Sequence, residues 1–349
     1  MKGPGRTFYF PLGKSGAAAN TGGMKPPPLA PLLTRRDSLR SLALATGGAA
    51  FGTQVFGQEK KAGTGAAAAP PAPEVKAESL GAKMAMITGA GGNILVLGGD
   101  DGALVVDSGL ENAALATTAA SKAEGGAPAF LVNTHWHFDH VGGNAAFAKL
   151  GARVVGTLNC LKRVSTDQHN EFLKKDIAPL PQQARPVIAV QDETQLHVNG
   201  EVIRLIPVAP AHTDGDLLVH LEKANVLHMG DVFFHGSYPF IDFSSNGWLG
   251  GVAAAVRTAM DYTDEKTRII PGHGKLATQQ DLKDYLAFLE AMYERMHNLQ
   301  SDGHSLEDAV STLPSKAYDE KLGKGFMTPD MFVRCTYLGI LKHEKAVAK

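Results

Sequence analysis

The strongest constraint on this chain is the stretch Thr134-His135-Trp136-His137-Phe138-Asp139-His140, which holds three histidines and an aspartate. His135 and His137 are two positions apart, so their side chains leave the same face of an extended segment. Asp139 continues this alternation, whereas His140 follows at once and points elsewhere. Imidazole nitrogens and carboxylate oxygens are common ligands of zinc and other first-row metals. The stretch therefore predicts two diverging ligand sets, as two neighbouring metal ions would need.

Three later residues extend this set. They are His212 in Pro-Ala-His-Thr-Asp-Gly-Asp, Asp231 in His-Met-Gly-Asp-Val and His273 in Pro-Gly-His-Gly. Each follows a short apolar run of the kind that forms a buried strand. Loops at the carboxyl ends of strands commonly carry ligand-binding residues in layered α/β folds. We therefore expect the four segments to converge on one site.

With these residues the chain resembles the metallo-β-lactamase superfamily. The His-x-His-x-Asp-His signature of that family is matched completely, and the later His, Asp and His occur in the family's order. The resemblance covers roughly residues 80 to 300 and implies an α/β fold. That fold is an αββα sandwich of two mixed β-sheets flanked by helices. The pattern is specific for the fold and much less specific for the substrate.

The resemblance also implies a ligand set divided between two zinc ions. The expected ligands are His135, His137 and His212 for the first ion, Asp139, His140 and His273 for the second, and Asp231 for both. Zinc lowers the pKa of bound water from about 16 to about 7, so a metal-bridging hydroxide can attack a carbonyl or phosphorus at neutral pH. Asp139 is expected to be catalytic as well, by orienting the hydroxide and passing a proton.

Asp231 narrows the expected substrate. In the true β-lactamase branches the corresponding position resembles Cys or Ser, whereas an aspartate there resembles thioesterases, lactonases, phosphodiesterases and related hydrolases. We therefore expect a metal-dependent hydrolase that acts on a small ester, lactone, thioester or amide. A β-lactamase side activity stays open because the attacking hydroxide is not selective.

Two further alternatives stay open. One is a mononuclear iron enzyme that resembles persulfide dioxygenases, which use only two His and the Asp as metal ligands. The other is a periplasmic metal-binding or redox-accessory protein. Two zinc ions per chain would favour hydrolysis, and one iron would favour oxygenation. Full metal content without turnover of esters, lactones or lactams would favour the accessory role.

The segment that follows Asp231 mixes aromatic residues with His235 and Tyr238. We expect these two side chains to contact the substrate or its oxyanion; the alternative is that the aromatic residues pack in the core and His235 is merely exposed. Trp136 and Phe138 alternate away from the ligands and are expected to be packing residues.

The N-terminal region has the layout of an export signal. Arg35 and Arg36, followed by a weakly apolar run at 42–56, resemble a twin-arginine signal, with cleavage expected after Gly57. We expect residues 1–57 to be this targeting segment, 58–79 a low-complexity linker and 80–349 the catalytic domain. The mature protein is then periplasmic or secreted, which disfavours a glutathione thioester because that thiol pool is mainly cytosolic.

Charge and composition exclude several partners. The formal net charge is -1, and no extra domain or basic excess points to nucleic acid. The apolar run at 42–56 is too short and Gly-rich for a stable membrane span. A small molecule is therefore the expected partner. Cys160 and Cys335 are the two cysteines; a disulfide stays open, but we expect two buried thiols.

The remaining patterns predict short strands, helices and a rim around the substrate cleft. Residues 157–192 are the expected rim, with a helix over 161–175 and a surface connection as the alternative. Asn199-Gly200 predicts a hairpin turn. Thr328-Pro329 predicts the start of a last helix. Expected strands are 84–88, 93–97, 103–107, 130–133, 153–156, 194–198, 201–208, 217–221, 225–229 and 268–270, and expected helices are 111–123, 144–150, 249–262 and 281–299.

Overall fold

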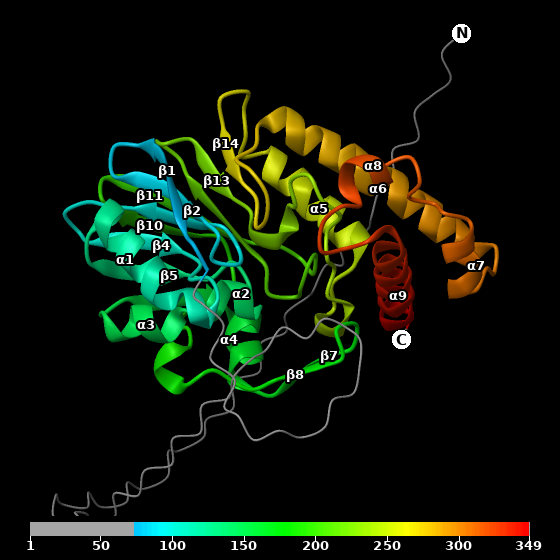
Figure 1. Cartoon of the computed structure of the whole chain (residues 1–349), viewed down its shortest axis with the longest axis horizontal. Helices are drawn as coiled ribbons and strands as arrows, with labels where there is room; N and C mark the ends of the chain where they lie inside the picture. Colours follow the sequence, from blue (N-terminus) through cyan, green and yellow to red (C-terminus); the bar gives the residue numbers. More distant parts are fainter. Residues whose placement is uncertain (1–72, 349) are drawn as a thin grey trace, which may run out of the picture. The chain divides into compact units, whose positions relative to one another are not determined.

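The computed structural model describes residues 73–348 (Figure 1). The expected export signal at 1–57 lies outside the described residues, as does most of the expected linker. Among the described residues, no helix is both long and apolar enough to cross a membrane.

The first strand, β1 (Lys76–Gly81), begins four positions before the expected domain start at residue 80. It is an edge strand that pairs antiparallel with β2 (Met84–Thr88). Only Leu80 of this strand is buried. The other residues are exposed and mostly polar or small, so the sequence alone resembles a linker. Backbone hydrogen bonds to β2 make it part of the sheet, and these do not depend on apolar side chains.

The first sheet has seven strands within the described residues, in the order β1-β2-β3-β4-β5-β6-β9. Pairs from β1 to β4 are antiparallel, and those from β4 to β9 are parallel, so the sheet is mixed. Parallel neighbours need crossover connections, which α1 (Ala114–Gly125) and α3 (Asn144–Lys149) supply. The strands not yet bounded are β3 (Ile94–Leu97), β4 (Ala103–Val106), β5 (Pro128–Val132), β6 (Arg153–Thr157) and β9 (Ile188–Val190).

The second sheet is also mixed, with the order β10-β11-β12-β13-β14. The last pair is parallel, and α5 (Leu249–Met260) lies in the connection between its strands. Asn199 and Gly200 both have positive φ angles and form the predicted hairpin turn between β10 and β11. The strands are β10 (Thr194–Val198), β11 (Glu201–Pro207), β12 (Leu217–Leu221), β13 (Val226–His228) and β14 (Arg268–Ile270).

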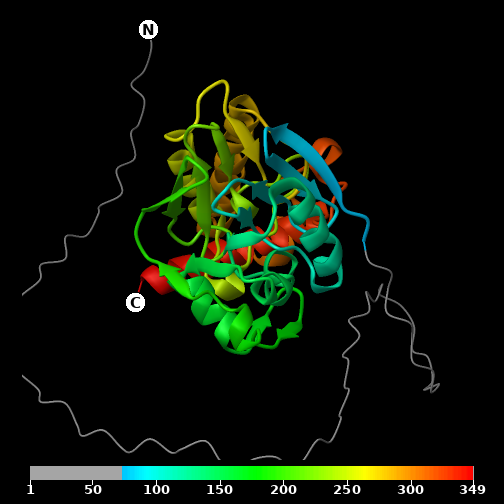
Figure 2. The same ribbon diagram turned by 90° about the vertical axis from the view of Figure 1, so that its left-hand side faces the viewer.

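Three apolar layers hold the domain together. Between the sheets, Leu104 and Val106 of β4 pack in one cluster with Leu205 of β11 and Val219 of β12. A second cluster lies between the first sheet and the helices of its outer face, and a third joins the second sheet to α5 and the C-terminal helices. Figures 1 and 2 show the helices that flank the sheets. This arrangement of helix, sheet, sheet and helix confirms the expected αββα sandwich.

The last helix begins where Thr328-Pro329 predicts, and the helix expected from residue 281 begins two residues earlier. Thr278 and Asp281 form a capping box at the start of α6 (Gln279–Ser301), and Thr328 caps α9 (Pro329–Val347) with Pro329 in the first turn. Cys160 and Cys335 are both buried free thiols, as expected. The helix expected over 111–123 begins with a 3-10 turn, η1 (Glu111–Ala113), before α1. The short helices α7 (Leu306–Ser311) and α8 (Asp319–Leu322) were not predicted from the sequence.

The predicted helix over 161–175 is wrong in its second half. Helix α4 (Leu158–Ser165) ends early, and an antiparallel ribbon of β7 (Gln168–Asn170) and β8 (Lys175–Ile177) follows. Thr166 is extended, and Lys174 has a φ of 51°, which no helix accommodates. A 3-10 turn, η2 (Gln182–Ala184), completes the segment.

Candidate metal centre

The chain delivers the seven expected ligands from four strand ends. The histidine stretch lies between β5 and α2 (Phe138–Val141). His212 follows β11, Asp231 lies in η3 (Gly230–Val232) directly after β13, and His273 follows β14. Strands β11, β13 and β14 run in the same direction, since β12 is antiparallel to both β11 and β13 and β14 is parallel to β13. Their carboxyl ends therefore meet at one edge of the sheet, as predicted.

The seven side chains form two adjoining groups. Within each group the potential ligand atoms lie within 4.8 Å of one another: His135, His137, His212 and Asp231 in the first, and Asp139, His140 and His273 in the second. Asp231 also reaches the second group, because its Oδ1 is 3.0 Å from His140 Nε2 and its Oδ2 is 3.4 Å from His273 Nε2. The structure thus places Asp231 between the groups, where the sequence pattern expects a shared ligand.

In the first group, each histidine engages one ring nitrogen with a neighbour and directs the other inward. The Nε2 atom of His137 is 3.0 Å from the Asp242 carboxylate, and the Nδ1 atom of His212 is 2.7 Å from the Phe240 carbonyl. Both oxygens accept a hydrogen bond from an imidazole N–H, so in neutral rings the inner nitrogens, His137 Nδ1 and His212 Nε2, carry the lone pairs. These two nitrogens face each other at 2.9 Å. A shared cation relieves the repulsion between them.

Asp107 fixes the orientation of a histidine of the second group, as Asp242 does for His137 in the first. This buried carboxylate accepts hydrogen bonds from His140 Nδ1 at 2.7 Å and from the Thr134 backbone N–H and hydroxyl. The Thr134 hydroxyl is in turn 3.1 Å from His135 Nδ1. One carboxylate therefore orients two expected ligands, and both rings direct Nε2 toward the centre.

Several buried atoms of this centre make no hydrogen bond of acceptable geometry among the described residues, although His140 Nε2 and Asp231 Oδ1 lie 3.0 Å apart. They are His135 Nε2, His140 Nε2 and Asp231 Oδ1. Leaving a polar atom buried and unsatisfied costs roughly 1–3 kcal/mol. All of them are good donors of electron pairs to a divalent cation. The residues present therefore fit a metal site better than a purely hydrogen-bonded one.

Electrostatics keep His135, His212 and Asp139 in metal-binding form. Burial lowers the pKa of His135 well below its usual value, and neighbouring His140 lowers it further. Burial likewise lowers the pKa of His212 to about 4. Burial alone would raise the pKa of Asp139, but His140 and His273 outweigh it and bring the pKa to about 2. The Asp139 carboxylate therefore stays ionised and the imidazoles of His135 and His212 stay neutral, the states in which they bind metal.

In the metal-free chain, protons balance the carboxylates of the second group. Burial lowers the pKa of His273, but Asp231 and Asp139 outweigh it and raise the pKa to about 10. The pKa of His140 is raised well above its usual value in the same way, by Asp231 and Asp139 against its burial. A cation bound there takes over the balancing role of these protons.

The centre opens into a cavity of about 320 Å³, lined by His137, Asp139, Asp231 and His273 among others. Asn170 and Ile177 of the β7–β8 ribbon line it too, so the rim expected within residues 157–192 is confirmed. Trp136 is buried, as predicted. The expectation that Phe138 packs internally is wrong, since it lines this cavity and is 38% exposed. The helix α2 turns its side chain outward, breaking the strand-like alternation.

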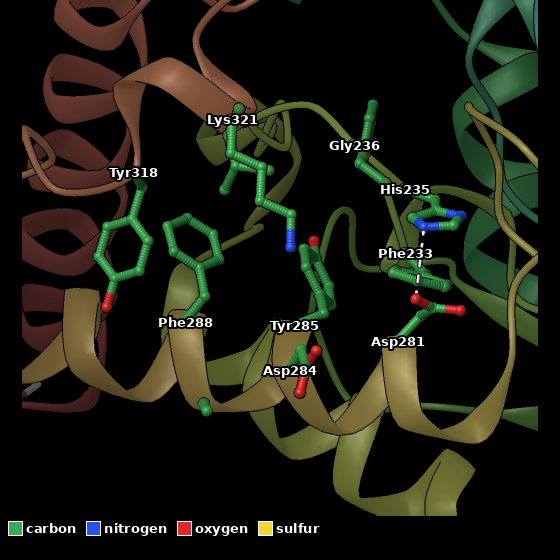
Figure 3. A pocket seen from close by; sticks show the side chains of 12 residues that line it. Phe233, His235, Gly236, Asp281, Asp284, Tyr285, Phe288, Tyr318 and Lys321 are labelled. Carbon is green, nitrogen blue, oxygen red and sulfur yellow. Dashed lines mark ion pairs between the residues drawn. The ribbon is translucent and has the colours of Figure 1, made fainter.

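Neither of the two residues expected to contact substrate offers its polar group to the centre. His235 lies in a different cavity, of about 440 Å³, where Figure 3 shows it with Asp281 and Phe233. Its Nδ1 is 2.9 Å from the Lys275 carbonyl. The Tyr238 ring lines the cavity at the centre, but its hydroxyl donates to the Asp319 carboxylate at 2.8 Å. The path of the backbone after Asp231 determines both orientations. The alternation of residue types along the sequence does not predict that path.

Asp107 and Asp242 are the functional residues that sequence reasoning missed. Asp107 directly follows the apolar strand β4, and Asp231 likewise comes soon after β13. The position of Asp107 at a strand end is therefore a sequence signal that could have identified it. Asp242 lies in an irregular segment before η4 (Phe243–Ser245), where no pattern marks it.

Comparison with known proteins agrees with this geometry. The family sequence model of the metallo-beta-lactamase superfamily matches residues 87–275 of this chain. The chain belongs to this superfamily. That match includes the whole histidine stretch together with His212, Asp231 and His273.

Curated relatives within the superfamily are hydrolases by name. A hydroxyacylglutathione hydrolase of Anaeromyxobacter dehalogenans is 34% identical over 142 residues, which are 40% of this chain and 45% of that protein. An acyl-coenzyme A thioesterase of Bos taurus is 23% identical over 207 residues, or 52% of this chain and 72% of that protein. The chain thus spans less than half the length of the first of these relatives.

Solved structures show the same fold. A stereoselective inverting sec-alkylsulfatase from a Pseudomonas species has a TM-score of 0.57 at 15% identity. The superposition covers 78% of this chain and 52% of the sulfatase chain. A metallo-β-lactamase from Cronobacter sakazakii has a TM-score of 0.53 at 17% identity. That superposition covers 66% of this chain and 97% of the lactamase chain. At these identities the likeness concerns the fold alone.

Proposed function

We propose that this protein is a metal-dependent hydrolase that uses two zinc ions to cleave a small thioester or ester. The observation that carries the proposal is the position of Asp231, which reaches both ligand groups at the wall of a cavity. A carboxylate shared between two groups of neutral imidazoles and carboxylates suits two adjacent divalent cations.

The two groups divide the ligands between the ions. His135, His137 and His212 would hold the first zinc ion, Asp139, His140 and His273 the second, and Asp231 both. Zinc in these positions supplies Lewis acidity, which makes water nucleophilic at neutral pH and stabilises negative charge on the substrate.

The chain's own residues contribute orientation and proton transfer. Asp139 lines the cavity, and its low pKa leaves its carboxylate free to accept a proton from an attacking water. Asp107 and Asp242 hold the imidazoles of His140 and His137 in place. The apolar walls of the cavity limit the access of bulk water to the reacting bond.

The choice of thioesters and esters rests on two supports. Asp231 occupies the position that distinguishes thioesterases and lactonases from true β-lactamases. The two curated relatives are named for the hydrolysis of thioesters. Lactones and amides stay in the test panel because the same nucleophile attacks them.

Metal analysis combined with a substrate panel tests the proposal. The purified chain should contain two zinc ions and hydrolyse acyl thioesters, with a hydroxyacylglutathione and an acyl-coenzyme A among the probes. Asp231→Ala should lose metal and turnover together, while the exposed control Asp100→Asn keeps both. Full metal and full turnover in Asp231→Ala would overturn the assignment. One iron per chain with oxygen-dependent turnover would support the dioxygenase alternative instead.

We also propose that residues 1–57 export the protein by a twin-arginine route. Its support is the paired Arg35-Arg36 before a weakly apolar run. Cell fractionation of the full chain should show a shortened protein outside the cytoplasm, and Arg35→Lys with Arg36→Lys should retain it inside. An uncleaved cytosolic chain in the wild type would overturn this proposal.

A further inference from the structure

The cavity at the centre has an aromatic wall that leads from a ligand toward solvent. The Phe240 ring lies 5.9 Å from the ring of His137 and 6.4 Å from the ring of Phe326. Phe240 is buried, whereas Phe326 is 66% exposed, and both line the cavity. The three rings therefore form a continuous row from the reacting end of the cavity to its mouth.

Further apolar side chains line the same cavity. Phe138 comes from α2, Leu173 and Ile177 come from the β7–β8 ribbon, and Met327 comes from the segment before α9. Phe138 and Phe326 are both large apolar side chains with exposed surface, and both border this one cavity. Exposed apolar surface gathered around a polar centre is typical of a site that binds an apolar ligand group.

Polar residues in the cavity are few apart from the expected ligands. Among the described lining residues, Asn170 and Ser237 are the polar ones outside the ligand set, and none is Lys or Arg. Lys175 lies over the ring of Phe138, with its ammonium 4.0 Å from the ring centroid. An anionic group on the acyl part of a substrate would therefore lose its hydration inside the cavity without meeting a Lys or Arg among the described lining residues.

We propose that the cavity binds the acyl group of the substrate as an uncharged apolar chain, and that Phe326 and Leu173 determine its preferred length. This inference rests on the proposed function, because it assigns one part of that substrate. The scissile carbonyl lies at the ligand end, and the acyl chain extends past Phe240 toward Phe326. Burial of each added methylene then strengthens binding in the transition state by up to about fourfold.

Acyl thioesters of N-acetylcysteamine, from acetyl to decanoyl, test the preference. The value of kcat/KM should rise more than tenfold from acetyl to hexanoyl and level off once the chain passes Phe326. Phe326→Ala should lower the hexanoyl-to-acetyl ratio by roughly tenfold. Leu115→Ala, at an 85% exposed position on α1, is the matched control and should leave the ratio and the rates unchanged. Circular dichroism and zinc content check that each variant is folded.

A second measurement separates this inference from the proposed function. Calorimetry with uncleavable S-ethyl and S-octyl thioethers of N-acetylcysteamine reports binding without turnover. Tighter binding of the octyl compound, weakened by Phe326→Ala, supports the inference even if no thioester or ester is cleaved. Turnover without dependence on chain length would overturn the inference and leave the hydrolase intact. A succinyl thioester preferred over the hexanoyl one would also overturn it, by placing an anion near Lys175.

Discussion

The Asp242 carboxylate accepts a hydrogen bond from His137 Nε2 at 3.0 Å, although the two residues are 105 positions apart in the sequence. Ser245 donates to the same carboxylate, and this holds Asp242 in place. Burial alone would raise the pKa of Asp242, but its contacts with His137 and Ser245 lower it well below the usual range. An ionised carboxylate at this position fixes the ring orientation of His137 and raises the basicity of its inner nitrogen.

Asp242→Asn is therefore expected to weaken metal binding without removing a ligand. Replacement of a carboxylate that supports a metal-binding histidine typically costs 10–100-fold in affinity. Competition with a chelator of known zinc affinity measures the change. Asp100→Asn, an exposed position paired with Lys83, is the control and should leave the affinity unchanged. Equal affinities in wild type and Asp242→Asn would show that Asp242 does not support the centre.

Gly272→Ala is expected to disrupt the centre by steric overlap. A Cβ atom at Gly272 would collide with Asp231 Oδ1 and with the backbone of Gly230. Overpacking of this kind costs typically 1–3 kcal/mol and would displace Asp231. We expect a lower free energy of unfolding together with reduced zinc content. In contrast, Gly339→Ala in α9 meets only ordinary contacts and should stabilise the protein by up to about 1 kcal/mol. Normal zinc content in Gly272→Ala would contradict the steric argument.

Tyr238→Phe tests whether the tyrosine hydroxyl is structural. The hydroxyl donates toward the Asp319 carboxylate at 2.8 Å and the Ser315 carbonyl at 3.1 Å, away from the cavity. Loss of this buried hydrogen bond should lower the free energy of unfolding by roughly 1–2 kcal/mol. Because the ring stays in place, kcat/KM for a thioester should change less than about twofold. A large drop in kcat at unchanged stability would return the hydroxyl to a role at the substrate.

His343 is expected to make part of the stability depend on pH. Its ring stacks on Trp248 at 3.6 Å, and burial lowers its pKa below the usual value of 6.5. The unfolded chain therefore binds this proton more tightly than the folded chain. Its contribution to stability is present above about pH 6.5 and is lost as the pH falls through the folded pKa.

Denaturant unfolding at pH 8 and pH 5 measures this effect. His343→Phe keeps an aromatic ring on Trp248 but cannot titrate, so its stability should fall less between the two pH values than that of the wild type. Trp248 fluorescence, read in a Trp136→Phe background, should change with pH only when His343 is present. Identical pH dependence in both chains would exclude this histidine as the titrating group.

Local patterns predicted most of the elements because their signals lie in neighbouring residues. The Asn199-Gly200 turn, the Thr328 cap and the strand at 268–270 occur where the sequence places them. The β7–β8 ribbon was missed because it contains short, polar strands whose stability comes from pairing with each other. The edge strand β1 was missed for the same reason.

The sequence by itself determined which side chains can bind metal and at which strand ends they occur, because ligand chemistry and alternation are properties of adjacent residues. Only the tertiary structure decided how those ligands are held and what faces them. Asp107 and Asp242 reach their histidines across 33 and 105 positions, and Phe326 joins Phe240 at the cavity from the far end of the domain. Contacts of this kind depend on how the two sheets and the C-terminal segment pack, and the free energy of that packing is shared over the whole core.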